Sequence, residues 1–328
     1  MRAARFIQHP VSGIQHRLAF QLQTAREFFT FPIAMEPLKN YLQARVKLID
    51  RALDSHLPRA TAKPATLHKA MRYSLFAGGK RLRPILCLAA AEACGGSPDA
   101  ALPHACAVEC IHTYSLIHDD LPCMDDDDFR RGVPTSHKVF GEGVAVLAGD
   151  ALLTIAFEIL ARAAETPRHP MHTLIHELAV ASGSHWLIGG QVADLEGEGK
   201  KLGGSELKFI HSAKTAALLT ASIRLGAMSA NAGHAKLRDL TQFGQSLGLA
   251  FQVIDDILDV TQTSEKLGKS AGKDAAAQKA TYPAVFGLEK SRKEAQRLTA
   301  QARRALEPFG KKGETLNALA DYLLKRDY

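Results

Sequence analysis

Residues 118–128 read His-Asp-Asp-Leu-Pro-Cys-Met-Asp-Asp-Asp-Asp, and this stretch sets both the fold and the chemistry that we expect. Apolar residues at helical spacing precede it over 108–117, so the first aspartates end a helix. Carboxylates at a helix C-terminus oppose its dipole and repel one another, and oxygen-preferring divalent cations would offset this repulsion. Pro122 stops the helix, which lets the chain fold back so that Asp119 and Asp125 reach one site.

A second acidic cluster ends a second apolar helix. Residues 251–259 read Phe-Gln-Val-Ile-Asp-Asp-Ile-Leu-Asp, in which Asp255 and Asp259 lie four apart on one helix face. Two such half-sites facing one cavity would grip a diphosphate through bridging magnesium ions. The alternative for Asp125 to Asp128 is a solvated acidic surface. The aspartates that we expect to bind magnesium are Asp119, Asp120, Asp125, Asp255, Asp256 and Asp259.

Basic residues accompany both acidic clusters. Residues 78–84, Gly-Gly-Lys-Arg-Leu-Arg-Pro, place three cations beside two glycines, where the backbone can approach an anion and arginine can fork onto phosphate. The segment lacks the Lys-Ser/Thr pair of a P-loop, and a charged surface is its alternative reading. Further basic residues lie at Arg130, Arg131, Lys214, Lys269, Lys273 and Lys279. Cations interleaved with carboxylates indicate a site that binds metal and phosphate together.

Composition favours a globular, helical protein whose partner is a small anion. Hydrophobic residues make up 46% and aromatic residues only 6% of the 328 residues, which suits a core built from helices. The net charge of +7 predicts a polyanionic partner, and without an arginine-rich helix we expect phosphorylated metabolites and no nucleic acid. The most apolar run, 144–164, contains Asp150, Glu158 and Arg162, so we expect no membrane span.

The chain divides near residue 35. Residues 1–34 are rich in arginine and carry one acid, which fits a transit peptide, an upstream start before Met35 or a disordered extension. Helical periodicity with short Gly/Pro turns follows over 36–328, with a first helix expected at 41–57 and no strands, so we predict one all-α domain. The five cysteines lack disulfide-framework or metal-pair spacing, and reduced thiols predict a cytoplasmic location.

Eight motifs together resemble bacterial-type farnesyl diphosphate synthases of the trans-prenyltransferase family over residues 36–328. They are Gly-Gly-Lys-Arg-Leu-Arg-Pro at 78–84, Glu-Cys-Ile-His at 109–112, the stretch at 118–128, Arg-Arg-Gly at 130–132, Leu-Ala-Gly-Asp-Ala-Leu at 147–152, Gly-Gly-Gln at 189–191, the stretch at 251–259 and Thr-Tyr-Pro at 281–283. The resemblance implies an all-α bundle of antiparallel helices around a deep central cavity, magnesium as cofactor and a homodimer.

The resemblance also implies roles for single residues. The metal would be bound by the six aspartates named above. The allylic diphosphate would be held by Arg130, Lys214, Thr215, Gln252, Lys269 and Lys279, and of these Lys214, Thr215 and Gln252 would line the space where positive charge develops. Isopentenyl diphosphate would be held by Lys80, Arg83, His112 and Arg131.

Tyr114 sets the expectation for product length. It lies five residues before Asp119, about 7.5 Å along the helix axis, where its ring could floor the cavity. In the resembling family an aromatic residue near this position accompanies short products, so we expect farnesyl diphosphate; packing in the core is the alternative role. Rival functions are a geranylgeranyl diphosphate synthase, an inactive partner subunit of a hetero-oligomeric prenyl synthase, and a terpene cyclase. A cyclase would not need a second diphosphate pocket.

Overall fold

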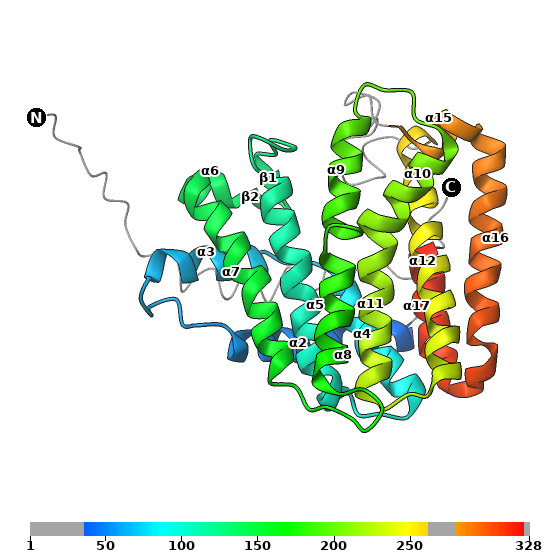
Figure 1. The fold of residues 1–328 in the computed structure, drawn as a ribbon, viewed down its shortest axis with the longest axis horizontal. Helices are drawn as coiled ribbons and strands as arrows, with labels where there is room; N and C mark the ends of the chain where they lie inside the picture. The colour runs from blue at the N-terminus through cyan, green and yellow to red at the C-terminus, as the bar shows by residue number, and fades with distance from the viewer. Residues whose placement is uncertain (1–35, 262–279, 325–328) are drawn as a thin grey trace, which may run out of the picture.

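The computed structural model describes residues 36–261 and 280–324 of the chain, and helices dominate them (Figure 1). The first half contains α2 (Glu36–His56), α3 (Ala65–Leu75), α4 (Leu82–Cys94), α5 (Pro98–Asp119), α6 (Ser136–Phe140) and α7 (Glu142–Ala161). The second half contains α8 (Met171–Ser182), α9 (Leu187–Gly197), α10 (Gly204–Ile210), the π-helix η3 (His211–Ala216), α11 (Ala217–Ser229), α12 (His234–Thr261), α15 (Tyr282–Phe286), α16 (Leu288–Leu306), the 3₁₀-helix η4 (Glu307–Gly313) and α17 (Glu314–Leu324). The predicted all-α class is confirmed.

The long helices stand side by side around one core. Figure 1 shows α5, α7, α11, α12 and α16 with their axes roughly aligned, while α2 and α3 run crosswise to them. A continuous cluster of buried apolar side chains runs from Leu38 in α2 to Leu324 in α17. Each helix contributes one apolar face to this cluster, as Leu42, Ile49 and Leu53 do from α2. The division at residue 35 stays a prediction, because residues 1–35 lie outside the described residues.

A short hairpin corrects the expectation of a strandless domain. β1 (Phe129–Arg130) pairs antiparallel with β2 (Val133–Pro134) directly after the first acidic cluster. The two residues of its turn, Arg131 and Gly132, have positive φ angles of 54° and 77°, the backbone of a tight hairpin turn. Two-residue strands are too short to give an alternating apolar pattern, so the sequence carries no strand signal here.

The expectation of no membrane span stays a prediction. Among the described residues, helix α7 is the one segment long and apolar enough to cross a membrane. By length and composition it is apolar enough, with a mean hydropathy of 2.0, although it contains Asp150 and Glu158. Its apolar character has a second explanation, because α7 packs along α5 and 44% of its most apolar window is buried. Its small residues allow this close packing: a methyl group built on Gly149 would lie 2.1 Å from Nε2 of His118. Core helices pass the same composition test.

Candidate active site

A cavity of about 470 Å³ opens between α5, α7, α9 and the π-helix η3. Six residues that the sequence singled out line its wall: Arg83, His112, Tyr114, Asp119, Lys214 and Thr215. Apolar side chains, among them Leu187, Val192 and Leu218, form the rest of the lining. The cavity therefore joins charged groups to an apolar hollow, as a site for a diphosphate attached to a hydrocarbon chain requires.

Asp119 ends α5 at the cavity, and the chain folds back behind it. The backbone N–H of Asp125 donates a hydrogen bond of 2.8 Å to the Asp119 carbonyl, which is the reversal that Pro122 predicts. Burial, with the neighbouring charges of Asp125 and Asp120, raises the pKa of Asp119 to about 6, although Lys214 and Arg130 oppose the shift. Burial and the neighbouring carboxylates disfavour the ionised form of Asp119, so a bound cation would stabilise it.

Asp120 pairs with an arginine of the same chain. It is buried, its Oδ1 accepts a hydrogen bond of 2.6 Å from Nε of Arg130, and Nη2 of the same arginine lies 2.5 Å from that oxygen in an ion pair. Arg130 also lies 3.6 Å from Asp127. The predicted metal ligand Asp120 and the predicted diphosphate ligand Arg130 are thus paired with each other. Asp120 acts through Arg130 in this arrangement, by fixing the direction of its guanidinium.

The second cluster lies on α12, and other residues of the chain contact Asp256 from several sides. Asp256 is only 3% exposed, and its carboxylate accepts hydrogen bonds from the backbone N–H of Tyr282 at 2.8 Å and from Nε2 of Gln252 at 3.2 Å. His211 Nε2 lies 3.4 Å from the same carboxylate. Hydrogen bonds from other residues of the chain therefore hold the Asp256 carboxylate in place. Tyr282 of the Thr-Tyr-Pro motif at 281–283 supplies that backbone N–H, which gives the motif a structural role.

The π-helix η3 joins the two clusters. Its wider turn carries Lys214 and Thr215, and such turns recur at functional sites. Lys214 Nζ lies 2.7 Å from Oδ2 of Asp194 on α9, and Thr215 donates a 3.1 Å hydrogen bond to Gln252 on α12. Lys214 also lowers the pKa of Asp119 through its charge. One lysine and one threonine thus connect the end of α5 with the α12 face that carries Asp255.

Sequence reasoning missed two residues of this connection. Asp194 follows Gln191 by three residues, and that spacing on a helix was the available signal. His211 gave no signal. It is buried, its ring stacks on Tyr282 at 5.5 Å between centroids, and burial lowers the pKa of its imidazole to about 4. It is therefore neutral and supports Asp256 without adding charge.

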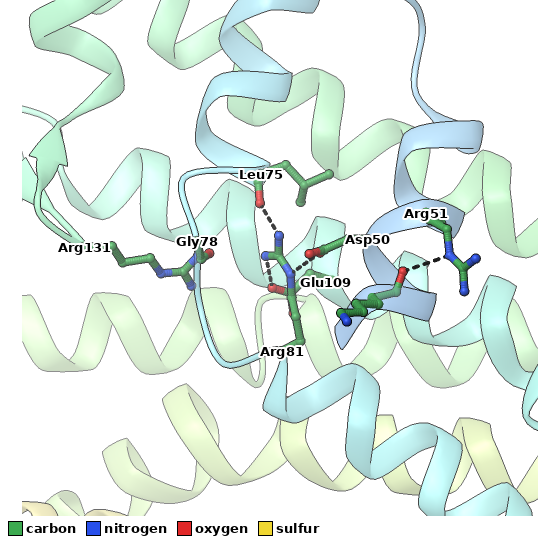
Figure 2. Close-up of polar contacts among 8 residues, drawn as sticks. Asp50, Arg51, Leu75, Gly78, Arg81, Glu109 and Arg131 are labelled. Carbon is green, nitrogen blue, oxygen red and sulfur yellow. Dashed lines mark hydrogen bonds and ion pairs between the residues drawn. The ribbon is translucent and has the colours of Figure 1, made fainter. Parts of the chain in front are cut away.

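The predicted isopentenyl diphosphate residues converge from three segments. Arg83 Nη1 lies 3.3 Å from Nε2 of His112, and the buried Nε of Arg83 has no hydrogen-bond partner. Burial and the charges of Arg83 and Arg131 lower the pKa of His112 far below its usual value, so the ring is neutral. Arg131 donates a hydrogen bond to the Gly78 carbonyl, as Figure 2 shows. An orphaned arginine N–H beside further cations suits an anion.

Lys80 and Tyr114 complete the described part of the site. Lys80 Nζ lies 5.8 Å from the centre of the Tyr322 ring on α17. Tyr114 is buried, lines the cavity and stacks edge-on against His118, and its hydroxyl has no hydrogen-bond partner. Tyr114 therefore belongs to both the core and the cavity wall. Lys269, Lys273 and Lys279 lie outside the described residues, so their predicted roles stay predictions.

Residues 64–319 match the Polyprenyl synthetase family, and this span covers most of the chain. The chain belongs to that family. Among curated relatives, the large subunit 1 of the heterodimeric geranylgeranyl pyrophosphate synthase of Arabidopsis thaliana is 53% identical over 88% of this chain and 79% of its own. A dimethylallyltranstransferase of Fischerella ambigua is 49% identical over 89% of this chain and 84% of its own.

Solved structures agree with the fold of this polyprenyl synthetase. A FPP/GFPP synthase from Zymomonas mobilis superimposes with a TM-score of 0.79 at 38% identity, covering 88% of this chain and 99% of its own. A geranyltransferase from Helicobacter pylori, solved with magnesium and isoprenyl diphosphate, gives 0.77 at 35% identity and covers 91% of this chain and 100% of its own. Trans-prenyl transfer between isoprenyl diphosphates is therefore the chemistry of this site.

The acidic residues suit magnesium better than a metal that needs a closed protein cage. Among residues 36–261 and 280–324, no three His, Cys, Asp or Glu side chains converge on one point. Magnesium needs only one or two carboxylates, because water and substrate phosphates complete its shell. Asp119, with its raised pKa, fits that role on one wall, and Asp255 fits it on α12.

Proposed function

We propose that this polyprenyl synthetase condenses isopentenyl diphosphate with allylic diphosphates and releases geranylgeranyl diphosphate, the twenty-carbon product. The observation that carries the condensation is the cavity in which Asp119, Lys214 and Arg83 lie on the wall of one apolar hollow. The twenty-carbon product is supported by relatives about half identical to this chain that are named geranylgeranyl pyrophosphate synthases, in Catharanthus roseus, Capsicum annuum and Arabidopsis thaliana.

Farnesyl diphosphate, the fifteen-carbon product that the sequence suggests, is the second candidate. One observation favours it, because the ring of Tyr114 lines the cavity beyond Asp119 and leaves less length for a chain. Solved structures at 38% and 40% identity also carry the names of a FPP/GFPP synthase and a farnesyl-diphosphate synthase. The two candidates share every step except the last condensation.

One set of residues acts on the allylic diphosphate, and a second set binds isopentenyl diphosphate. Magnesium held by Asp119, Asp125 and Asp255 would supply positive charge beside the leaving diphosphate. Lys214, which Asp194 orients, adds charge there as the allylic C–O bond breaks and leaves a carbocation. The hydroxyl of Thr215, which lines the cavity, is fixed by the 3.1 Å hydrogen bond that it donates to the side chain of Gln252. Water-poor walls protect the cation from hydrolysis.

The second substrate supplies the electrons. Arg83, His112 and Arg131 hold the diphosphate of isopentenyl diphosphate, so that its double bond lies against the carbocation. The double bond attacks and forms the new carbon–carbon bond, and the adduct carries the positive charge. Loss of a proton to the released diphosphate then restores a neutral product with one more isoprene unit.

We extend the proposal to a homodimer formed through α7 and α9. Leu147 on α7 and Trp186, immediately before α9, are apolar side chains with exposed fractions of 58% and 38%, and neither is among the described residues that line the cavity. Burial of such a surface favours association. The relative named as a large subunit of a heterodimeric synthase points to a different partner. Light scattering on the purified chain decides between a dimer, a monomer and a chain that needs another subunit.

The deciding experiment is a product analysis. Purified chain with magnesium, labelled isopentenyl diphosphate and each of dimethylallyl, geranyl and farnesyl diphosphate should give geranylgeranyl diphosphate from all three allylic substrates. Accumulation of the fifteen-carbon product, with no turnover of farnesyl diphosphate, would select the second candidate. No product from any starter would fit the inactive-subunit alternative.

The compartment is a proposal too. We expect the cytoplasm, because all five cysteines are free thiols and such thiols persist in a reducing compartment. Relatives named chloroplastic make the chloroplast the competing location. Fluorescent fusions of the full chain and of a chain starting at Met35 test this: identical cytoplasmic signals support the proposal, and organelle signal from the full chain alone contradicts it.

A further inference from the structure

The buried charges nearest the isopentenyl diphosphate residues do not line the cavity. Arg81 is 3% exposed and Glu109 is 1% exposed, and neither is among the described residues that line the hollow. Both belong to motifs noted in the sequence, yet the mechanism above uses neither. A buried charge is costly unless it is paired, so this pair requires a structural or functional reason.

Arg81 ties together three helical segments. Its guanidinium donates hydrogen bonds to Glu109 on α5 at 2.8 Å, to Asp50 on α2 at 2.9 Å and to the Leu75 carbonyl at the end of α3 at 2.6 Å. Figure 2 shows the guanidinium enclosed by these three acceptors, with the loop of Gly78 beside it. Burial alone would lower the pKa of Arg81, but Glu109 and Asp50 outweigh it and raise the pKa, so Arg81 stays charged.

The backbone of Arg81 is what this anchoring controls. Arg81 has φ 49° and ψ 35°, a left-handed conformation that a residue with a side chain adopts only under constraint. It is the residue immediately before α4, and it lies between Lys80 and Arg83. The direction in which the chain enters α4 therefore depends on Arg81, and with it the position of Arg83 against His112.

Glu109 also acts on the cations around it. Its negative charge favours the protonated forms of Arg83 and Arg131, whose pKa values burial lowers. Arg131 is connected to the same loop, because it donates to Gly78 and its guanidinium lies against Gly79. The three arginines thus interact electrostatically with one buried carboxylate, to which Arg81 also donates a hydrogen bond.

We infer that Arg81, anchored by Glu109 and Asp50, is a positioning residue that preorganises Arg83 and Arg131 for the diphosphate of isopentenyl diphosphate. This inference rests on the proposed function and concerns one of its two substrates. On the allylic side, Lys214 lies on η3 and Asp119 ends α5 ten residues beyond Glu109, and neither is among the residues to which Arg81 donates. The signature of the role is therefore an effect on one substrate alone.

The test compares both substrates in Arg81→Lys. Lysine keeps the charge, but a single ammonium cannot reach the three acceptors in the fixed geometry of a guanidinium. We expect KM for isopentenyl diphosphate to rise about tenfold, with kcat and KM for the allylic diphosphate within about twofold of the wild-type values. Calorimetric titration with isopentenyl diphosphate alone should show the same loss of affinity and requires no turnover.

Arg72→Lys is the matched control. Arg72 makes the same kinds of contact between α3 and its surroundings, with Asp54 on α2 and the Pro58 carbonyl, but away from the pocket. The Arg72→Lys variant should leave KM unchanged for both isopentenyl diphosphate and the allylic diphosphate. Asp50→Asn is the milder variant, since Asp50 is partly exposed and its loss leaves the buried pair with Glu109 intact. We expect it to raise KM for isopentenyl diphosphate about threefold.

Three outcomes would overturn the inference. The first is a folded Arg81→Lys protein with wild-type affinity for isopentenyl diphosphate. The second is an equal change in both KM values, which would indicate a general structural role. The third applies if Arg81→Lys does not fold: it is an unchanged KM for isopentenyl diphosphate in Asp50→Asn. A wild-type chain that binds isopentenyl diphosphate without condensing it contradicts the proposed function and leaves the calorimetric comparison valid.

Discussion

The guanidinium of Arg131 lies against the backbone of Gly79, so closely that a methyl group on Gly79 would be 2.5 Å from Nη1 of Arg131. The two residues are far apart in the chain, one in the loop before α4 and the other in the turn of the β1–β2 hairpin. Their contact brings the two basic motifs side by side. Residue 79 is a glycine for two reasons. The contact leaves no room for a side chain, and the φ of 122° is unfavourable for any other residue.

Replacing Gly79 with alanine should therefore displace Arg131. We expect KM for isopentenyl diphosphate to rise about tenfold or more, because the methyl group and the guanidinium cannot occupy their present positions together. Gly141→Ala is the control. Gly141 also has a positive φ, 83°, but nothing lies within 4 Å of a methyl group there. Steady-state kinetics that change equally in both variants would show that backbone strain alone is responsible.

Replacing Tyr114 with alanine should lengthen the product by at least one isoprene unit, because the ring lines the cavity that holds the growing chain. Tyr114→Phe is the matched control, since it keeps the ring and removes only a buried hydroxyl that has no hydrogen-bond partner. We expect it to leave chain length unchanged and to raise stability slightly, by about 1 kcal/mol. Chromatography of the products and thermal unfolding check both variants. Equal product lengths for alanine and tyrosine would exclude the ring as the floor.

Asp255 and Asp256 should respond differently to substitution by asparagine. Asp256 accepts hydrogen bonds from Tyr282 and Gln252, and an asparagine keeps one oxygen for these donors. Asp255→Asn removes a charge that we propose binds the metal and should lower the condensation rate about 100-fold, whereas Asp256→Asn should lower it less than about tenfold. Rates measured across a magnesium titration should show the deficit of Asp255→Asn shrinking at high magnesium. The reverse ranking would assign Asp256 to the metal.

Acid should destabilise the protein through His104. Burial lowers the pKa of this imidazole to about 4 in the folded chain, against a usual value of 6.5. Between these values the unfolded chain binds the proton and the folded chain does not, so stability falls as the pH drops from 6.5 towards 4. The loss amounts to about 3 kcal/mol for the full shift. Denaturant unfolding of wild type and His104→Leu at several pH values measures it. An identical pH slope in both proteins would contradict this assignment.

Much of the site follows from local sequence, because each acidic motif lies on or at the end of one apolar helix. The apolar spacing before Asp119 and before Asp255 predicts the two helices, and Pro122 predicts the reversal after α5. The excess of interleaved aspartates, lysines and arginines predicts a site for metal and diphosphate. These inferences need only helical periodicity and the repulsion between like charges, which act over short stretches of chain.

Pairings between distant segments could not be predicted in this way. Asp120 binds Arg130, Lys214 binds Asp194, and Asp256 accepts the Tyr282 N–H, so part of each predicted cluster is occupied by protein. The sequence shows only that a carboxylate is present. Which partner it meets depends on how helices pack, and that packing is set by the whole core.

The amino-acid sequence alone determined that this chain is an all-helical domain carrying two acidic and several basic motifs, because those properties reside in periodicity and composition. The tertiary structure decided which charges face the hollow and which are held by neighbours, including the anchoring of Arg81 by Glu109 and Asp50. It also placed Tyr114 in the cavity wall. The physical reason is that burial and ion pairing depend on contacts between residues far apart in the chain, and only the folded core brings these together.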